Sequence, residues 1–230
     1  MTKFLLAAAS IAAMASSANA QDVVASPFTG AYVGVQGSIA QVDDYADDLD
    51  YWYTGVKQNR TSDRGGLIGL RAGYDIQSGA LLGGVMVEGS FGKINSFEEL
   101  SSTANDDPIL KIGTRVTKLG SIRAKAGVTS GNLAAFVTGG LAFSNAKQKF
   151  RETDGSDERY DGKGDRTGYV LGLGAAYAIN ANSTIGLDYS HYEFGSKTHD
   201  LLESDGSFTD YRWAQDYKVR ALTVSFNYGF

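Results

Sequence analysis

The chain has 230 residues, of which 21 are basic and 26 acidic, giving a formal net charge of −5 at pH 7. This acidic balance argues against a nucleic-acid-binding protein, which needs a basic face. The sequence contains no cysteine, which excludes a disulfide framework and thiolate metal sites. Glycine is abundant at 29 residues, and together with 13 Tyr and 11 Phe it indicates a β-protein, because glycine disfavours helices.

The first 20 residues have the pattern of a cleaved secretory signal peptide. A positive residue, Lys3, precedes a short apolar run over 4–14, and Ala18-Asn19-Ala20 is typical of a signal peptidase site. The alternative is a membrane anchor, but the apolar run is too short to cross a bilayer. We therefore expect a signal peptide over 1–20 and a single exported β-domain over 21–230.

Eight segments alternate between apolar and small or polar residues with a period of two, which is typical of strands with two unlike faces. These segments are 30–40, 65–74, 84–92, 120–128, 133–143, 167–178, 183–192 and 220–230.

The connections between these segments alternate in length. Tight turns rich in Gly, Asn and Ser lie at 76–79, 129–132 and 179–182, whereas long polar stretches cover 41–64, 92–118, 145–166 and 195–215. Short turns at one end and long loops at the other are the layout of an outer-membrane barrel. The predicted fold is an all-β, eight-stranded, antiparallel up-and-down transmembrane barrel, with short periplasmic turns and four long extracellular loops.

The polar face of these strands is rich in Gly, Ser and Thr, which suits the narrow lumen of an eight-stranded barrel rather than a solvated sheet. A soluble sandwich or lipocalin-like barrel also alternates, but a water-exposed face would carry more Lys and Glu. Burying a few charges is costly unless they pair. We therefore expect a lumen charge network that closes the barrel to large solutes, formed by Arg71, Glu88, Arg123, Lys125 and Asp188.

Aromatic residues on the apolar face cluster near the strand ends, as in the two aromatic girdles of membrane barrels. The predicted girdle near the short turns contains Tyr74, Tyr177, Tyr228 and Phe230. The predicted girdle near the long loops contains Phe91, Phe143 and Tyr169.

Catalytic candidates are few. The chain has two histidines, and His199 is followed by Asp200 with Ser196 nearby, which are the residue types of a base-activated nucleophile at the outer rim. Adjacent residues of an extended chain point apart, however, so this pair offers no triad geometry. His191 falls on the lipid face beyond Tyr189 and is interpreted as an interface residue. We expect no enzyme activity.

Binding candidates lie in the predicted loops. Carboxylates cluster in "DDYADDLDYWY" and "DGSDERYDGKGD", but neither matches the glycine-containing calcium loop, so no metal site and no cofactor are expected. Tyr51, Trp52, Tyr53 and Trp213 are aromatic loop residues that either bind a flat ligand such as haem, contact a partner or anchor the loops among lipid headgroups. The sequence leaves these alternatives open.

Several blocks resemble the small porin-like outer-membrane β-barrel family of α-proteobacteria, which are surface barrels of the OmpA-like and OmpX-like kind. The most specific are "VTGGLAF" and "AINANSTIGLDYSHYEFG", and the resemblance extends over nearly all of the chain after the signal peptide. It implies an abundant, often antigenic barrel in the bacterial outer membrane, and some relatives are reported to bind haem. The sequence departs from the family pattern at Phe28, Val128 and His191.

The segment "ALTVSFNYGF" is predicted to be the closing strand, which pairs with the first strand and removes the sheet edge. Its final aromatic, Phe230, resembles the label that the outer-membrane insertion machinery reads. The expected partners are therefore that machinery, outer-membrane lipids and lipopolysaccharide, with no nucleic acid. The expected function is a structural and surface role without a wide pore; the alternatives are a narrow porin, a haem or cation receptor, or an outer-membrane enzyme.

Overall fold

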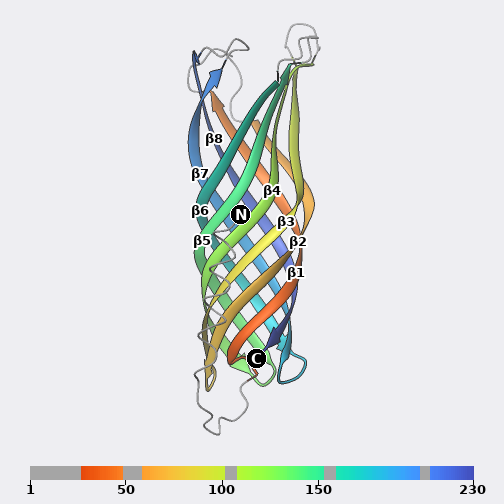
Figure 1. Ribbon diagram of the computed structural model, residues 1–230, viewed down its shortest axis with the longest axis vertical. Helices are drawn as coiled ribbons and strands as arrows, with labels where there is room; N and C mark the ends of the chain where they lie inside the picture. Colours follow the sequence, from red (N-terminus) through yellow and green to blue (C-terminus); the bar gives the residue numbers. More distant parts are fainter. Residues whose placement is uncertain (1–26, 49–58, 102–107, 153–158, 203–207) are drawn as a thin grey trace.

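The computed structural model describes residues 27–48, 59–101, 108–152, 159–202 and 208–230, and side chains over 27–43, 62–94, 115–145, 165–195 and 217–230. The described chain forms eight strands that wind around one axis (Figure 1). Their bounds are β1 Gly30–Asp48, β2 Asn59–Ser78, β3 Leu81–Ser101, β4 Pro108–Ser130, β5 Leu133–Glu152, β6 Arg159–Ala178, β7 Ser183–Leu202 and β8 Phe208–Gly229. Among the described residues, no helix is long and apolar enough to cross a membrane.

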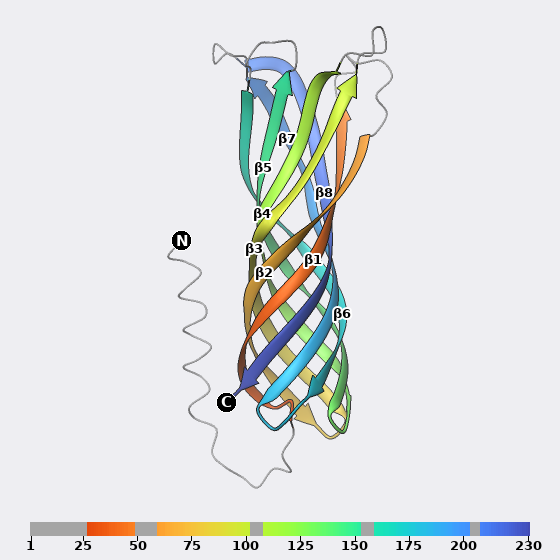
Figure 2. The same ribbon diagram turned by 90° about the vertical axis from the view of Figure 1, so that its right-hand side faces the viewer.

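Each strand pairs with its neighbours in the sequence, and β1 also pairs with β8, so the sheet is a closed antiparallel barrel. Figure 2 shows the strands tilted across the barrel axis and the tight turns gathered at the end where the chain finishes. Gly79 and Gly131 have φ values of 59° and 58° in two of these turns, a left-handed conformation that glycine adopts without strain. The predicted fold is therefore confirmed.

The strands continue much further than the alternation predicted. Most of each segment expected to be loop is strand: within 92–118, for example, β3 reaches Ser101 and β4 begins at Pro108. A strand of 20 residues such as β2 is about 66 Å long and rises about 47 Å at a tilt near 45°, whereas the apolar band of a membrane barrel is roughly 25 Å tall. The outer part of the barrel therefore projects beyond the membrane.

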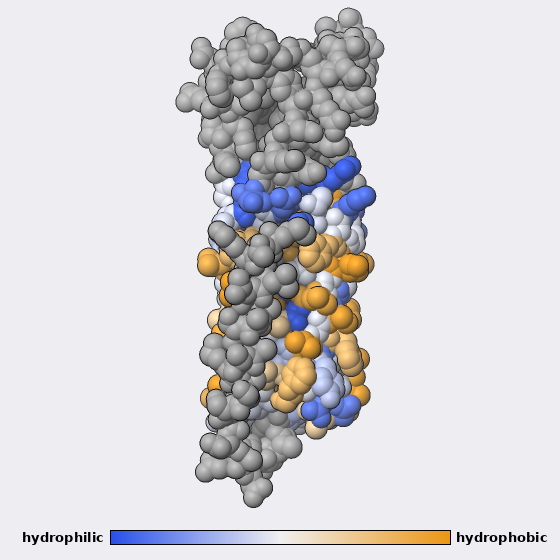
Figure 3. All heavy atoms as spheres, in the orientation of Figure 1, coloured by the Kyte–Doolittle hydropathy of each residue, from blue (hydrophilic) through white to orange (hydrophobic). Residues whose placement is uncertain are grey.

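The outward side chains are apolar in the half of the barrel that carries the short turns, and a polar band lies beyond them toward the other end (Figure 3). Outward residues such as Ile68, Leu141 and Leu173 are 74%, 56% and 61% exposed, as expected for side chains that face lipid. The expected girdle residues also point outward: Phe91, Tyr169, Tyr177, Tyr228 and Phe230 are exposed, and Tyr74 and Phe143 are half-buried.

Inward glycines make room for the larger side chains of the lumen. A Cβ added to Gly174 would lie 2.7 Å from the Phe136 ring and 2.8 Å from Asp188 Oδ1. The small residues of the inward face, which the sequence interpretation took as a sign of a narrow lumen, therefore let a few bulky or charged side chains fill it.

Candidate functional site

The middle of the lumen contains a charge network centred on Glu88 of β3. Arg71 Nη1 of β2 is 2.9 Å from Asp188 Oδ2 of β7, and Arg71 Nη2 is 3.5 Å from Glu88 Oε2. Arg123 of β4 pairs with Glu88 Oε1. All four side chains are at most 5% exposed. Two cations and two anions therefore balance one another inside the barrel.

Neutral groups complete the shell around Glu88. Its Oε1 accepts hydrogen bonds from Ser121 Oγ at 3.0 Å and from the Tyr192 hydroxyl at 2.7 Å. Arg123 also donates to Ser190 Oγ at 2.7 Å, and its guanidinium lies 5.2 Å from the centre of the Tyr192 ring. These contacts tie three strands, β3, β4 and β7, together across the lumen.

Gln36 of β1 joins this network to the neighbouring strands. It accepts a hydrogen bond from Arg71 Nε at 2.6 Å and donates to Ser90 Oγ at 2.8 Å. Gln36 lies on the inward face of β1 but is uncharged, and so it was not part of the predicted charge network.

Lys125, the fifth residue of the predicted network, pairs elsewhere. Its Nζ is 2.7 Å from Asp75 Oδ2, and lies 5.1 Å and 5.0 Å from the ring centres of Tyr32 and Phe136. The predicted set therefore divides into the central network and a separate pair nearer the short turns. Asp75 was missed, although it lies four residues from Arg71 and so must share its face of the strand.

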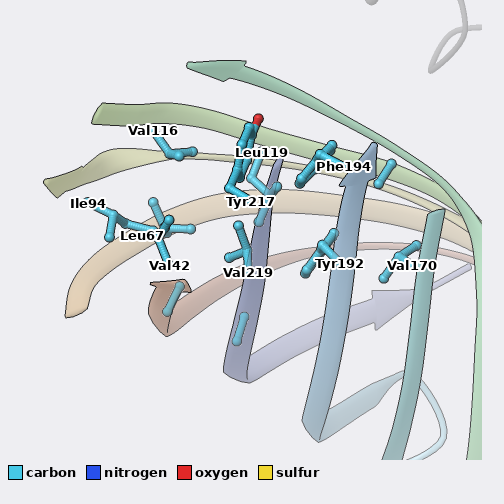
Figure 4. Packing of buried hydrophobic residues seen from close by; sticks show 13 residues of the cluster. Val42, Leu67, Ile94, Val116, Leu119, Val170, Tyr192, Phe194, Tyr217 and Val219 are labelled. Carbon is cyan, nitrogen blue, oxygen red and sulfur yellow. The ribbon is translucent and has the colours of Figure 1, made fainter. Parts of the chain in front are cut away.

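Toward the extracellular end most lumen side chains are apolar, with the buried polar residues Ser144 and Arg166 against Tyr217, and this was not anticipated. Figure 4 shows side chains from several strands pointing into the same space. We call this set the outer apolar layer: Ala40, Val42, Leu67, Ile94, Val116, Leu119, Ala142, Val170, Tyr192, Phe194, Tyr217, Val219 and Ala221. The Phe194 and Tyr217 rings stack with centroids 4.9 Å apart.

The periplasmic end is narrowed by a second, smaller set, the inner apolar layer: Phe28, Leu82, Ala134, Phe136 and Ala178. Phe28 precedes β1 and is only 7% exposed. A cavity of about 70 Å³ lies here, lined among others by Phe28, Tyr32 and Lys125. It has room for a few water molecules but not for a nutrient-sized solute.

The other predicted site residues are not brought together in the described part of the structure. Tyr51, Trp52 and Tyr53 lie outside the described residues. Trp213 lies on β8 and His199 and Asp200 lie on β7, rather than in the predicted loop, and their side chains are outside the described set.

His191 lies on the outer surface, 3.8 Å from Glu193 Oε2. Glu193 also accepts a hydrogen bond from the Tyr169 hydroxyl and is 3.6 Å from Lys218 Nζ. Within the described ranges, no group of three or more His, Asp or Glu side chains is placed to hold a metal ion. The predicted signal peptide and the acidic stretches around 43–53 and 154–165 lie largely outside the described side chains.

A closed eight-stranded barrel with an apolar outer belt and a filled lumen defines the class of integral outer-membrane β-barrel proteins. Residues 4–230 match the model of the outer membrane protein beta-barrel domain family, and the chain belongs to that family. It is located in the bacterial outer membrane.

The 31 kDa outer-membrane immunogenic proteins of Brucella melitensis and Brucella suis are similar to this chain. Each is 31% identical over 247 residues, which cover 96% of this chain and 98% of the relative. Among solved structures, Pseudomonas aeruginosa OprG has a TM-score of 0.53 at 16% identity, covering 88% of this chain and 96% of that one. The Escherichia coli outer membrane protease OmpT has a TM-score of 0.51 at 10% identity, covering 87% and 97%. These two structures support the fold.

Proposed function

We propose that this protein is a closed structural and surface barrel of the outer membrane, without a wide pore. The observation that carries the proposal is the filling of the lumen by three successive sets of side chains: the inner apolar layer, the charge network and the outer apolar layer. Each set draws residues from several strands, so the barrel wall is also cross-linked through its interior.

The outer apolar layer is the principal barrier to solutes and ions. Phe194 and Tyr217 are 0% and 1% exposed, and their stacked rings occupy the space that a channel would need. An ion entering this layer would lose most of its hydration among mainly apolar side chains, and the Tyr217 hydroxyl there is already hydrogen-bonded to Ser144 Oγ, so entry is unfavourable. The charge network lies on the periplasmic side of this layer. It cross-links the barrel wall and is a second barrier in the lumen rather than the only one.

Conductance in planar lipid bilayers tests the closed state. The wild-type barrel is expected to show no steady conductance, and Phe194→Ala/Tyr217→Ala is expected to show frequent openings because it removes the stacked rings. The matched control is Leu187→Ala/Val224→Ala, which removes two outward side chains that are 51% and 56% exposed. A steady wide pore in the wild type, or openings equal in both variants, would contradict the proposal.

The surface role rests on the projecting strand ends and on the relatives. The Brucella relatives are named as immunogenic, and a barrel whose strands rise beyond the membrane presents its outer end to the exterior. We infer that this end contacts external partners and that the protein has no catalytic role. Antibodies against peptide 49–58 should label intact cells; labelling only after permeabilisation would contradict surface display.

Assembly through β8 is part of the same proposal. β8 closes the barrel against β1, and its outward residues Phe226 and Tyr228, with Phe230 directly after the strand, form an exposed aromatic row. We infer that the insertion machinery recognises this row. Phe230→Gln should slow barrel assembly in cells far more than Val137→Gln, an outward change of similar polarity on β5. Equal effects of the two changes would contradict recognition of β8.

A further inference from the structure

A collar of polar outward side chains lies immediately beyond the apolar belt. On each strand the outward row changes from apolar to polar there: Ile39 is followed by Gln41 on β1, Phe91 by Lys93 on β3, and Leu222 by Arg220 on β8. Figure 3 shows this hydrophilic band above the hydrophobic surface. Because the short turns are periplasmic, the collar lies at the level of the outer leaflet's headgroups.

Charge is distributed unevenly around this collar. On β8 the cations are matched, since Arg220 Nη2 is 2.6 Å from Asp43 Oδ2 and Lys218 Nζ is 3.6 Å from Glu193 Oε1. On β5 and β6 the collar contains Asn145, which donates to Asp165 at 2.8 Å. These parts of the collar therefore contribute little net positive charge.

The collar is basic on β2, β3 and β4. The exposed residues Arg64, Lys93 and Lys118, which we call the basic patch, follow one another on these adjacent strands. Arg64 Nε donates to Gln41 at 3.2 Å, and the neighbouring Asp63 carboxylate accepts the Arg64 backbone N–H at 2.7 Å. Within the described chain, no carboxylate is paired with Lys93 or Lys118.

The strand register brings the two lysines together. Phe91 pairs with Lys118, and the register between β3 and β4 shifts between Phe91 and Ile94, so Lys93 lies in an irregularity next to Lys118. Bulges of this kind redirect side chains. Two like charges side by side repel each other, and an anion placed between them relieves that repulsion. Phe91, the outward residue that precedes Lys93 on β3, is 55% exposed and belongs to the apolar belt.

We propose that the basic patch binds the phosphate groups of the glycolipid of the outer leaflet, with its acyl chains against Phe91 and the apolar belt. Phosphate is the chemical group recognised, and the position of the patch at the top of the belt favours a lipid source over free phosphate. Each surface cation near an anionic headgroup contributes about fivefold in affinity, so the two lysines together contribute about 25-fold.

The test uses the folded full-length barrel in zwitterionic micelles, with native mass spectrometry of bound bis-phosphorylated lipid A. The wild type should bind this lipid at least tenfold more tightly than its dephosphorylated form. Lys93→Gln/Lys118→Gln should bind about 25-fold more weakly, whereas Lys93→Arg/Lys118→Arg should retain binding. The matched control Lys218→Gln/Arg220→Gln removes two paired cations from the same level and should change binding less than threefold.

Three results would overturn the proposal. They are wild-type affinity in the Lys93→Gln/Lys118→Gln variant, an equal loss in the control, and displacement of the lipid by an equal concentration of inorganic phosphate. Gel mobility of unboiled samples verifies that every variant is folded before binding is compared.

Discussion

Replacing Glu88 with Gln should destabilise the barrel strongly, because Glu88 is the shared acceptor of the lumen network. Its carboxylate contacts Arg71, Arg123, Ser121 and Tyr192 while only 5% exposed. The substitution preserves size but removes the charge and turns an amide N–H₂ toward the cations. In the Glu88→Gln variant Arg71 still has the Asp188 carboxylate at 2.9 Å. Among the described residues, the remaining partners of Arg123 are all neutral, such as Ser190.

The expected cost follows from leaving Arg123 buried without a carboxylate. Removing one partner of a buried ion pair costs about 3–5 kcal/mol, whereas an exposed pair contributes about 0–1 kcal/mol. Glu193→Gln is the matched control, because Glu193 is 33% exposed and faces Lys218 on the outer surface. It should change the free energy of unfolding by less than about 1 kcal/mol.

Urea-induced unfolding of the barrel in lipid vesicles, followed by far-ultraviolet circular dichroism and by the mobility of unboiled samples, measures both variants. The double variant Glu88→Gln/Arg123→Gln removes the unmatched charge and should recover part of the loss. A Glu88→Gln variant within about 0.5 kcal/mol of the wild type would refute the reasoning, since ordinary surface changes are of that size.

Two further predictions concern the barrel wall and the collar. Gly140→Ala should lower the free energy of unfolding, because the added Cβ would collide with the Ile122 carbonyl oxygen. Gly89→Ala is the control, because the space around its Cβ is open, and it should leave the free energy of unfolding unchanged. Equal urea midpoints for the two variants would contradict this prediction. Burial raises the pKa of Asp43, but hydrogen bonds from Arg220 and other donors outweigh it and hold that pKa below its ordinary value. The Asp43 contribution to stability is therefore present above about pH 4 and is lost as the pH falls through the lower folded-state pKa. The stability difference between the wild type and Asp43→Asn should shrink below about pH 4, and a difference that is independent of pH would contradict this assignment.

The strand count, the closed topology and the two faces of each strand could be read from the sequence, because alternation of side chains is a local property of the pleat. Val35 and Leu173 face outward and Gln36 and Asp188 inward for this reason alone. The strand ends could not be read in the same way. Beyond the apolar belt the outward residues are polar, so the apolar outward row that marked the strands disappears, although pairing continues to Asp48 and Ser101.

Alternation along the strands is enough to place charged residues such as Arg71, Arg123 and Lys125 in the lumen. Their partners depend on the folded barrel, because Arg71 meets Asp188 across 117 positions of the chain, and Lys125 meets Asp75 across 50. These pairings depend on the register of every strand between the two residues, and a local sequence pattern contains no information about register. The same registers place Phe194 against Tyr217, so an apolar layer as well as paired charges occupies the lumen.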